Sequence, residues 1–284
     1  MMKSHKVTGG GGVGLHVVEA GKSTGRPILF IHGFSQCWLA FARQFDSELA
    51  DHHRLVAMDM RGHGLSDKPR DAYAESKSWA DDVDAVIREL HLDHPILCGW
   101  SYGPFLILDY IRHYGEEGIG GIHIVDGITN LGSDEAASVL APAFLDLVPG
   151  FFATDVEESA KSLESLLRMC FVHEPAPAEL YLMLGYNLSV PPHVRQALFS
   201  RTVDNDDLLP TLRKPALITH GADDAIVSPS VVEAHKAGMA HAQVHMMANA
   251  GHAPFWDDAE SFNRRLEAFG ESLYSRKRTQ PART

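Results

Sequence analysis

The sequence is poor in cysteine, in long apolar runs and in clustered positive charge. It contains three cysteines, an odd number, at the widely spaced positions Cys37, Cys98 and Cys170. A secreted disulfide framework needs an even set at closer spacing, so that class of protein is excluded. A reducing cytoplasm is the simpler expectation for this chain. We expect Cys98, which lies in an apolar stretch, to be a buried thiol that behaves as a small hydrophobe.

Long apolar stretches are absent. No segment approaches the ~20 apolar residues that a membrane-spanning helix requires. Residues 1–8 lack the apolar core that is typical of a secretory signal peptide. These two absences predict a soluble protein without a membrane partner.

Positive charge is scarce and dispersed. The chain has 25 Lys and Arg against 37 Asp and Glu, which gives a formal net charge of −12. Nucleic-acid binding requires clustered basic side chains that neutralise phosphates, so that function is excluded. The one basic run lies in residues 275–284, which we expect to form a disordered, solvated tail.

Motifs for a cofactor or a metal are missing as well. Gly9, Gly11 and Gly14 match the spacing G-x-G-x-x-G, but a dinucleotide fingerprint needs a preceding strand and a following helix. Here residues 15–19 alternate like a strand, so the glycine run predicts a hairpin turn. The 17 histidines show no zinc spacing and no H-E-x-x-H motif. We therefore expect no cofactor and no metal.

The sequence does contain a regular alternation of apolar strands and amphipathic helices. Short apolar runs predict strands at residues 28–32, 55–59, 96–98, 122–126, 216–220 and 244–247. Apolar residues at helical spacing lie between them, for example from Trp79 to Leu90. This alternation predicts an α/β fold, a mainly parallel central sheet flanked by helices.

The rhythm of strands and helices stops between residues 129 and 212. Helical runs and proline-rich breaks fill this segment, which has no convincing core strand. We interpret 129–212 as a helical cap inserted into a core domain formed by 1–128 and 213–274. The cap holds four basic and twelve acidic residues, so a strongly anionic substrate is disfavoured.

The cap also has many large apolar side chains. We expect most of them to pack against the core and a minority to line a pocket for an apolar group. They are Phe144, Leu145, Leu147, Val148, Phe151, Phe152, Met169, Phe171, Tyr181, Leu182, Met183 and Tyr186.

The segment Gly99-Trp100-Ser101-Tyr102-Gly103 is the strongest indication of chemistry. It joins a predicted strand to an apolar helical run. A strand that reverses into a helix within one residue strains that residue, and the flanking glycines leave room for it. The serine would then project above the sheet, near unpaired N–H groups at the helix start that can stabilise an oxyanion. The segment predicts a nucleophilic Ser101.

A nucleophilic serine requires a histidine base and a carboxylate that orients the histidine. Asp224 and His252 each follow a predicted strand, and they come after Ser101 in that order along the chain. Asp223 is adjacent to Asp224, and Asp126 also follows a strand. Both therefore remain alternative candidates for the carboxylate.

These features together resemble the α/β-hydrolase family, in particular its small capped serine esterases and lactonases. Two further segments carry the resemblance over nearly the whole chain. Phe30-Ile31-His32-Gly33-Phe34 is similar to the family's oxyanion loop. Asp59-Met60-Arg61-Gly62-His63-Gly64-Leu65-Ser66 is similar to its D-x-R-G-x-G-x-S segment.

The resemblance implies specific roles for five residues. Ser101, Asp224 and His252 would form a catalytic triad. The backbone N–H groups of Phe34 and Tyr102 would stabilise the oxyanion. The family spacing thus favours Asp224 as the carboxylate.

Other residues of these motifs have structural interpretations. His32 and His63 are expected to tie backbone segments together rather than to react. Trp38 and Phe41 begin a helical stretch, and packing explains them at least as well as substrate contact. Pro104 stands where many relatives have a glycine, and the first turn of a helix tolerates it.

The resemblance implies a serine carboxylesterase that acts on esters with small to medium apolar acyl groups. The same residues would also serve an N-acyl-homoserine lactonase, a C–C bond hydrolase or a cofactor-free perhydrolase. An alternative of another class is a ligand-binding sensor of this fold with little turnover. The expected partner is a small ester or lactone, and the oligomeric state stays open, with a homodimer among the alternatives.

Overall fold

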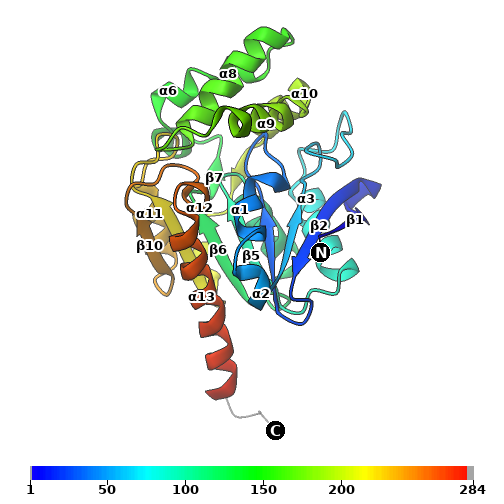
Figure 1. The fold of residues 1–284 in the computed structure, drawn as a ribbon, viewed down its shortest axis with the longest axis vertical. Helices are drawn as coiled ribbons and strands as arrows, with labels where there is room; N and C mark the ends of the chain where they lie inside the picture. The colour runs from blue at the N-terminus through cyan, green and yellow to red at the C-terminus, as the bar shows by residue number, and fades with distance from the viewer. Residues whose placement is uncertain (1, 280–284) are drawn as a thin grey trace.

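The fold is built around an eight-stranded sheet (Figure 1). The computed structural model describes residues 2–279, with side chains up to residue 273. The strands, in their order across the sheet, are β1 (Lys3–Thr8), β2 (Gly14–Gly21), β4 (His53–Met58), β3 (Arg26–Ile31), β5 (Ile96–Trp100), β6 (Gly121–Val125), β9 (Ala216–Gly221) and β10 (Gln243–Met247). Neighbours run parallel from β4 to β10, whereas β1 and β2 are antiparallel at one edge. The predicted α/β fold with a mainly parallel sheet is confirmed.

Burial explains why the central strands could be predicted from the sequence. Residues 28–31 of β3 and 96–98 of β5 are fully buried. Parallel strands covered on both faces read as continuous apolar runs, which is the pattern of these segments. The edge strand β10 differs, because its Val244 and Met246 are exposed.

Helices cover the sheet. Helix α3 (Ser76–Glu89) packs against α4 (Gly103–Tyr114), and α13 (Ala259–Thr279) packs against α1 (Ala42–Phe45) and α12 (Pro254–Asp257). In Figure 1, α1, α12 and α13 lie on the viewer's side of the sheet. Shorter helices complete the core: η2 (Trp38–Phe41), α2 (Leu49–His52), η3 (Leu209–Thr211) and α11 (Val231–Gly238). In α3 the buried face includes Trp79, Val83 and Val86, as its helical spacing predicts.

Residues 130–204, between β6 and β9, form a segment that we call the helical insertion. Its elements are β7 (Asn130–Leu131), α5 (Asp134–Ser138), α6 (Pro142–Leu145), α7 (Val148–Phe151), α8 (Val156–Met169), α9 (Pro177–Leu188), α10 (Pro192–Phe199) and β8 (Val203–Asp204). Strands β7 and β8 pair with each other, so the predicted cap adds no strand to the main sheet. Figure 1 shows α6, α8, α9 and α10 gathered at one end of the molecule.

Arg195 holds the helices of the insertion together. Its side chain is only 1% exposed, and its Nε donates to the carbonyl oxygen of Phe151 at 2.6 Å. Its other nitrogens donate to the carbonyls of Asn187 and Val190 and to Ser159 Oγ. These contacts join Arg195, on α10, to α7, α8, α9 and the turn between α9 and α10, and burial lowers the pKa of Arg195 to about 10.

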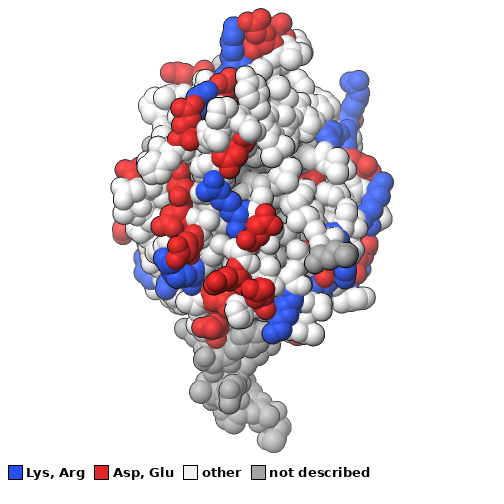
Figure 2. Space-filling model, viewed as in Figure 1, with Lys and Arg blue, Asp and Glu red and all other residues white. Residues whose placement is uncertain are grey.

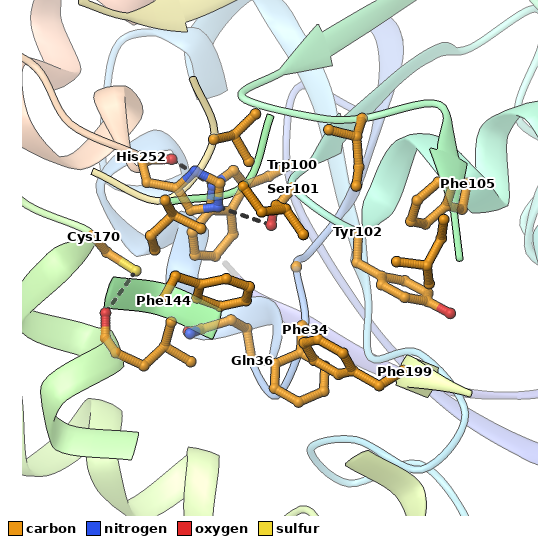
Figure 3. A pocket seen from close by; sticks show the side chains of 17 residues that line it. Phe34, Gln36, Trp100, Ser101, Tyr102, Phe105, Phe144, Cys170, Phe199 and His252 are labelled. Atoms are coloured by element: carbon orange, nitrogen blue, oxygen red, sulfur yellow. Dashed lines mark hydrogen bonds between the residues drawn. The ribbon is translucent and has the colours of Figure 1, made fainter. Parts of the chain in front are cut away.

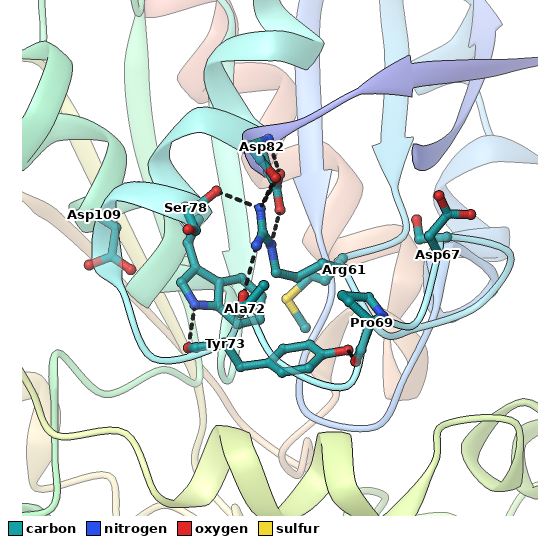
Figure 4. Close-up of polar contacts among 12 residues, drawn as sticks. Arg61, Asp67, Pro69, Ala72, Tyr73, Ser78, Asp82 and Asp109 are labelled. Carbon is teal, nitrogen blue, oxygen red and sulfur yellow. Dashed lines mark hydrogen bonds and ion pairs between the residues drawn. The ribbon is translucent and has the colours of Figure 1, made fainter. Parts of the chain in front are cut away.

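The glycine run forms the predicted hairpin turn, because η1 (Gly10–Gly12) joins the antiparallel strands β1 and β2. A Cβ added to Gly9 would lie 2.2 Å from Asp82 Oδ1, so no side chain fits there. The buried Asp82 accepts from Gly10 N at 2.9 Å and from Arg61 Nε at 2.6 Å (Figure 4). The arginine of the D-x-R-G segment thereby fixes the hairpin against α3.

Helix α13 extends to Thr279 and so enters the predicted basic tail, 275–284. Its buried residues Phe262, Leu266, Phe269 and Leu273 recur at helical spacing, and the following Arg and Lys are good helix formers. The disordered tail expected over 275–279 therefore differs from the structure, and 280–284 lie outside the described residues. None of the described helices, α13 included, is long and apolar enough to cross a membrane.

The surface carries the acidic character of the sequence. On the face shown in Figure 2, Asp and Glu side chains are spread over the insertion and the core. Lys and Arg lie scattered among them on this face and form no extended basic patch among the described residues.

Candidate active site

Ser101 lies at the sharp turn between β5 and α4. Its φ is +56°, in the left-handed region that residues with a side chain rarely adopt. The glycines on either side are sterically required. A Cβ on Gly99 would lie 2.7 Å from the carbonyl carbon of Gly103, and one on Gly103 would lie 2.4 Å from Ile31 O. The sequence pattern therefore located this strained turn correctly.

The structure brings Ser101, His252 and Asp224 together (Figure 3). His252 Nε2 lies 2.8 Å from Ser101 Oγ, and His252 Nδ1 lies 2.8 Å from Asp224 Oδ2. An ionised Asp224 can only accept, so the hydrogen-bond network assigns the imidazole proton to Nδ1. The lone pair of Nε2 then faces the serine hydroxyl and can accept its proton.

Asp224 is held rigidly in a loop after β9. Its side chain is fully buried, and Oδ1 accepts hydrogen bonds from Ile226 N at 2.8 Å and Val227 N at 3.0 Å. Burial alone would raise the pKa of Asp224, but the neighbouring His252 and these donors lower it below its ordinary value. Asp224 is therefore the charged partner of His252. The neighbouring Asp223 is exposed and makes no such contact.

Asp126 lies behind this pair at the end of β6. Its Oδ1 accepts from Gly221 N at 2.8 Å, and its buried Oδ2 has no donor among the described residues. Burial and the charge of Asp224 raise the pKa of Asp126 well above its ordinary value. Asp126 is therefore a poorer anionic partner for His252 than Asp224, whose pKa is lowered. The structure thus leaves it beside the Ser101 site but outside the hydrogen-bonded chain.

The cluster of Asp126, Asp224 and His252 is also the set of described residues whose geometry comes nearest to a metal site. Both oxygens of Asp224 and both ring nitrogens of His252 already have protein partners. The pKa of the third group, Asp126, is raised, because burial and the charge of Asp224 disfavour its carboxylate. A cation would have to displace these contacts, so we assign no metal to this cluster.

Two backbone N–H groups border the serine. Those of Phe34 and Tyr102 have no hydrogen-bond acceptor among the described residues, which suits them to hold an oxyanion. The loop of Phe34 approaches the serine closely, since a Cβ on Gly33 would lie 2.9 Å from Ser101 Cβ. Both predicted donors thus lie beside the predicted nucleophile.

His32 and His63 support the loop that carries Phe34. His32 Nε2 accepts from Met60 N at 3.0 Å, and its Nδ1 donates to Gly33 O at 2.8 Å. His63 Nε2 accepts from Ser35 N at 3.3 Å. Burial lowers the pKa of His63 to about 3, so it stays neutral. Both histidines tie backbone segments together, as predicted from the sequence.

A largely apolar pocket of about 660 Å³, partly open to solvent, surrounds Ser101. The core contributes aromatic and aliphatic side chains, including Phe34, Phe105 and Ile226. The helical insertion contributes Leu131, Leu140, Phe144, Leu166, Cys170 and Phe199. Of the cap residues singled out in the sequence, Phe144 alone is part of this lining. Trp38 and Phe41 are not part of it, which agrees with their packing role.

A buried ion pair connects the insertion to the residue after the nucleophile. Arg201 donates to Asp109 Oδ2 at 2.7 Å and to Tyr102 Oη at 3.2 Å, and both charged side chains are at most 2% exposed. Tyr102 in turn donates to Leu198 O at 3.3 Å. Sequence reasoning missed this pair, because Arg201 and Asp109 lie far apart in the chain and in no motif.

Comparisons with known proteins agree with this geometry. The family model described as "alpha/beta hydrolase fold" matches residues 26–259. An esterase structure from Rhodococcus sp. ECU1013 is 33% identical with a TM-score of 0.90, over 95% of this chain and 99% of that one. A thermophilic esterase from Thermogutta terrifontis is 25% identical with a TM-score of 0.78, over 95% and 99%.

A curated relative is also similar over most of its length. The pimeloyl-[acyl-carrier protein] methyl ester esterase of Stenotrophomonas maltophilia is 28% identical, over 91% of this chain and 97% of its own. Esterases therefore recur among both the solved structures and the curated relatives. With the family match spanning most of the chain, this protein belongs to the α/β-hydrolase family and is a hydrolase with esterase relatives.

Proposed function

We propose that this protein is a serine carboxylesterase for esters with small to medium apolar acyl groups. The observation that carries the proposal is the chain of hydrogen bonds from Ser101 Oγ through His252 to Asp224. Ser101 borders an apolar pocket, and two backbone N–H groups beside the serine have no acceptor among the described residues. A nucleophile, a base and an orienting carboxylate in contact are what acyl transfer needs.

The first half-reaction acylates the enzyme. His252 Nε2 takes the hydroxyl proton while Ser101 Oγ attacks the ester carbonyl carbon. The N–H groups of Phe34 and Tyr102 stabilise the negative oxygen of the tetrahedral intermediate, and each such donor is worth ~10²-fold or more in rate. The C–O bond to the alcohol then breaks, and His252 gives its proton to the leaving oxygen.

The second half-reaction returns the enzyme to its starting state. His252 takes a proton from water, and the hydroxyl oxygen attacks the acyl carbon. When this second tetrahedral intermediate collapses, the bond to Ser101 Oγ breaks and the proton returns from His252 to the serine. The carboxylic acid leaves, and no cofactor enters the balance.

The pocket supports an uncharged substrate. No Lys, Arg, Asp or Glu is among its lining residues in the described part of the chain. An ionised acyl chain would lose hydration there without gaining a partner. We also infer a reducing compartment, since all three cysteines are free and buried.

Steady-state hydrolysis of p-nitrophenyl esters from acetate to dodecanoate tests the proposal. Wild type is compared with Ser101→Ala, whose fold is checked by circular dichroism. Multiple turnover that disappears in Ser101→Ala supports the esterase. Turnover with N-acyl-homoserine lactones or β-diketones alone would instead favour a lactonase or a C–C hydrolase. Binding without turnover on every substrate would favour a sensor.

A further inference from the structure

The pocket beside Ser101 contains one polar side chain that has neither a role in the proposed mechanism nor a partner among the described residues. Most polar atoms in the lining have partners: Trp100 Nε1 donates to His252 O, Tyr102 Oη to Leu198 O and Cys170 Sγ to Leu166 O. The exception is Gln36. Its side-chain amide has no hydrogen bond to any described residue, although the residue is only 3% exposed.

Gln36 lies in the loop after β3, two residues beyond the oxyanion donor Phe34. Its backbone N–H donates to Gly33 O at 3.3 Å, which fixes the start of the side chain close to the serine. In Figure 3 the amide extends among the lining side chains, below Ser101 and His252 in the view. The amide group is therefore presented to the pocket and not to bulk solvent.

Two other buried polar side chains each donate a hydrogen bond to the protein. Ser35 Oγ, one residue earlier, donates to Asn187 O at 3.3 Å. Gln44 Nε2 donates to Phe255 O at 2.8 Å and to Asn263 Oδ1 at 3.1 Å. The amide atoms of Gln36 are not among the fully buried polar atoms that lack a partner, so they face the open space of the pocket, where a ligand group can pair with them. The amide nitrogen of Gln44 is bonded by the fold, whereas no described residue bonds the amide of Gln36, which indicates that Gln36 serves the pocket.

We propose that Gln36 selects neutral esters that carry one uncharged hydrogen-bonding group, such as an ether, carbonyl or hydroxyl, a few atoms from the scissile carbonyl. This inference rests on the proposed esterase function and narrows its substrate class. The amide supplies both a donor and an acceptor, so it pairs with any of these groups. The lack of charged lining residues makes a neutral partner the matching one. The remaining surface accepts the apolar parts of the same substrate.

Matched esters in which one oxygen replaces one methylene test this role. The acyl pairs are methoxyacetate against butanoate, β-methoxypropanoate against pentanoate and γ-methoxybutanoate against hexanoate, all as p-nitrophenyl esters. The alcohol pair is the methoxyethyl against the butyl ester. Gln36→Met keeps the side-chain length but removes both hydrogen-bonding groups. Gln196→Met is the matched control, because Gln196 is exposed on α10.

We expect Gln36→Met to lower the oxygen-to-methylene ratio of kcat/KM by about tenfold for at least one pair, the size of one hydrogen bond. The intrinsic reactivity of each ester cancels in the comparison of wild type with variant. Gln196→Met should leave every ratio unchanged. Gln36→Asn should move the preference to a different oxygen position, because its amide reaches less far.

The outcomes separate the two proposals. If Ser101-dependent hydrolysis is present but Gln36→Met changes no ratio, the role of Gln36 is refuted and the esterase stands. If no ester is hydrolysed, the esterase proposal fails. The role of Gln36 is then read from calorimetric binding of the same pairs to Ser101→Ala, with and without Gln36→Met. An unchanged ratio of dissociation constants in that measurement also refutes it.

Discussion

Substitution by asparagine should affect activity very differently at the two buried aspartates beside His252. In Asp224→Asn the amide oxygen must occupy the Oδ1 position, because Ile226 N and Val227 N both donate there. The amide NH₂ then faces His252 Nδ1 and forces that nitrogen to accept. The ring proton moves to Nε2, opposite Ser101 Oγ, and the base is lost. We expect kcat to fall by about 10⁴-fold, the size of a wrong-tautomer defect in such triads.

In Asp126→Asn the amide oxygen keeps the hydrogen bond from Gly221 N. The NH₂ group takes the place of Oδ2, which has no hydrogen-bond donor among the described residues, and burial already disfavours the charge of Asp126. We therefore expect kcat/KM to stay within about threefold of wild type, because both ring nitrogens of His252 keep their partners Asp224 and Ser101. Asp223→Asn, at the exposed neighbour of Asp224, is the control and should also leave activity unchanged.

The pH dependence of the stability of Asp126→Asn tests the raised pKa of Asp126 independently of activity. Folded Asp126 keeps its proton above the ordinary pKa of 3.8, whereas unfolded Asp126 releases it. Wild type therefore loses stability as pH rises above about 4, by at most ~1.4 kcal/mol per pH unit, until the native pKa is reached. The variant has no such loss, so the difference between its melting temperature and that of wild type should shift in favour of the variant from pH 4 to pH 8. Ester hydrolysis and thermal scans of the three variants measure both effects. A large activity loss in Asp126→Asn with little loss in Asp224→Asn would refute the assignment of the carboxylate.

Three further predictions concern the rest of the fold. Arg201→Met should lower the free energy of unfolding by about 3 kcal/mol or more, because it leaves Asp109 buried without its partner. In urea titration, the double variant Arg201→Met, Asp109→Leu should recover most of this lost free energy. No recovery would show that Arg201 acts in another way. Gly185→Ala should raise stability by about 0.5–1 kcal/mol, since Gly185 is helical and an added Cβ meets no atom within 4 Å; a lower melting temperature would contradict this. Burial lowers the pKa of His123 from 6.5 to about 3, so wild type should lose stability as pH falls through this range. His123→Gln should lose less stability over the same pH range. An equal loss in the variant would mean that His123 titrates normally.

The sequence was informative where local geometry imposes residue types. The strained turn at Ser101 requires small neighbouring residues, and strands that are buried on both faces require continuous apolar runs. Both features could therefore be predicted from the sequence. The order of serine, aspartate and histidine followed from the parallel sheet, whose strands all end at one edge. Asp224 and His252 could be located for that reason.

Features that depend on distant partners were not visible. Arg201 and Asp109 pair across 92 positions, and neither residue type by itself indicates burial. Most residues that line the pocket were missed for a similar reason: a cap helix has apolar residues toward both the core and the pocket, and periodicity does not separate them. The raised pKa of Asp126 likewise follows from its burial and from the charge of Asp224, which only the folded structure brings together. Gln36 gave no signal, since glutamine is common in loops.

The pairing of β7 with β8 has a consequence for how this enzyme can be altered. Asn130 and Asp204 are cross-strand neighbours, so the chain leaves and re-enters the core within about 5 Å. Arg112 on α4 clamps the returning strand through Asp204 O and Asn205 Oδ1. The helices between these points can therefore be exchanged at one junction, while β6 and β9 keep their register. Recombination at this one junction would replace most of one wall of the pocket. The new segment would have to restore the ion pair of Arg201 with Asp109 and the hydrogen bond from Ala253 N, next to His252, to Cys170 O.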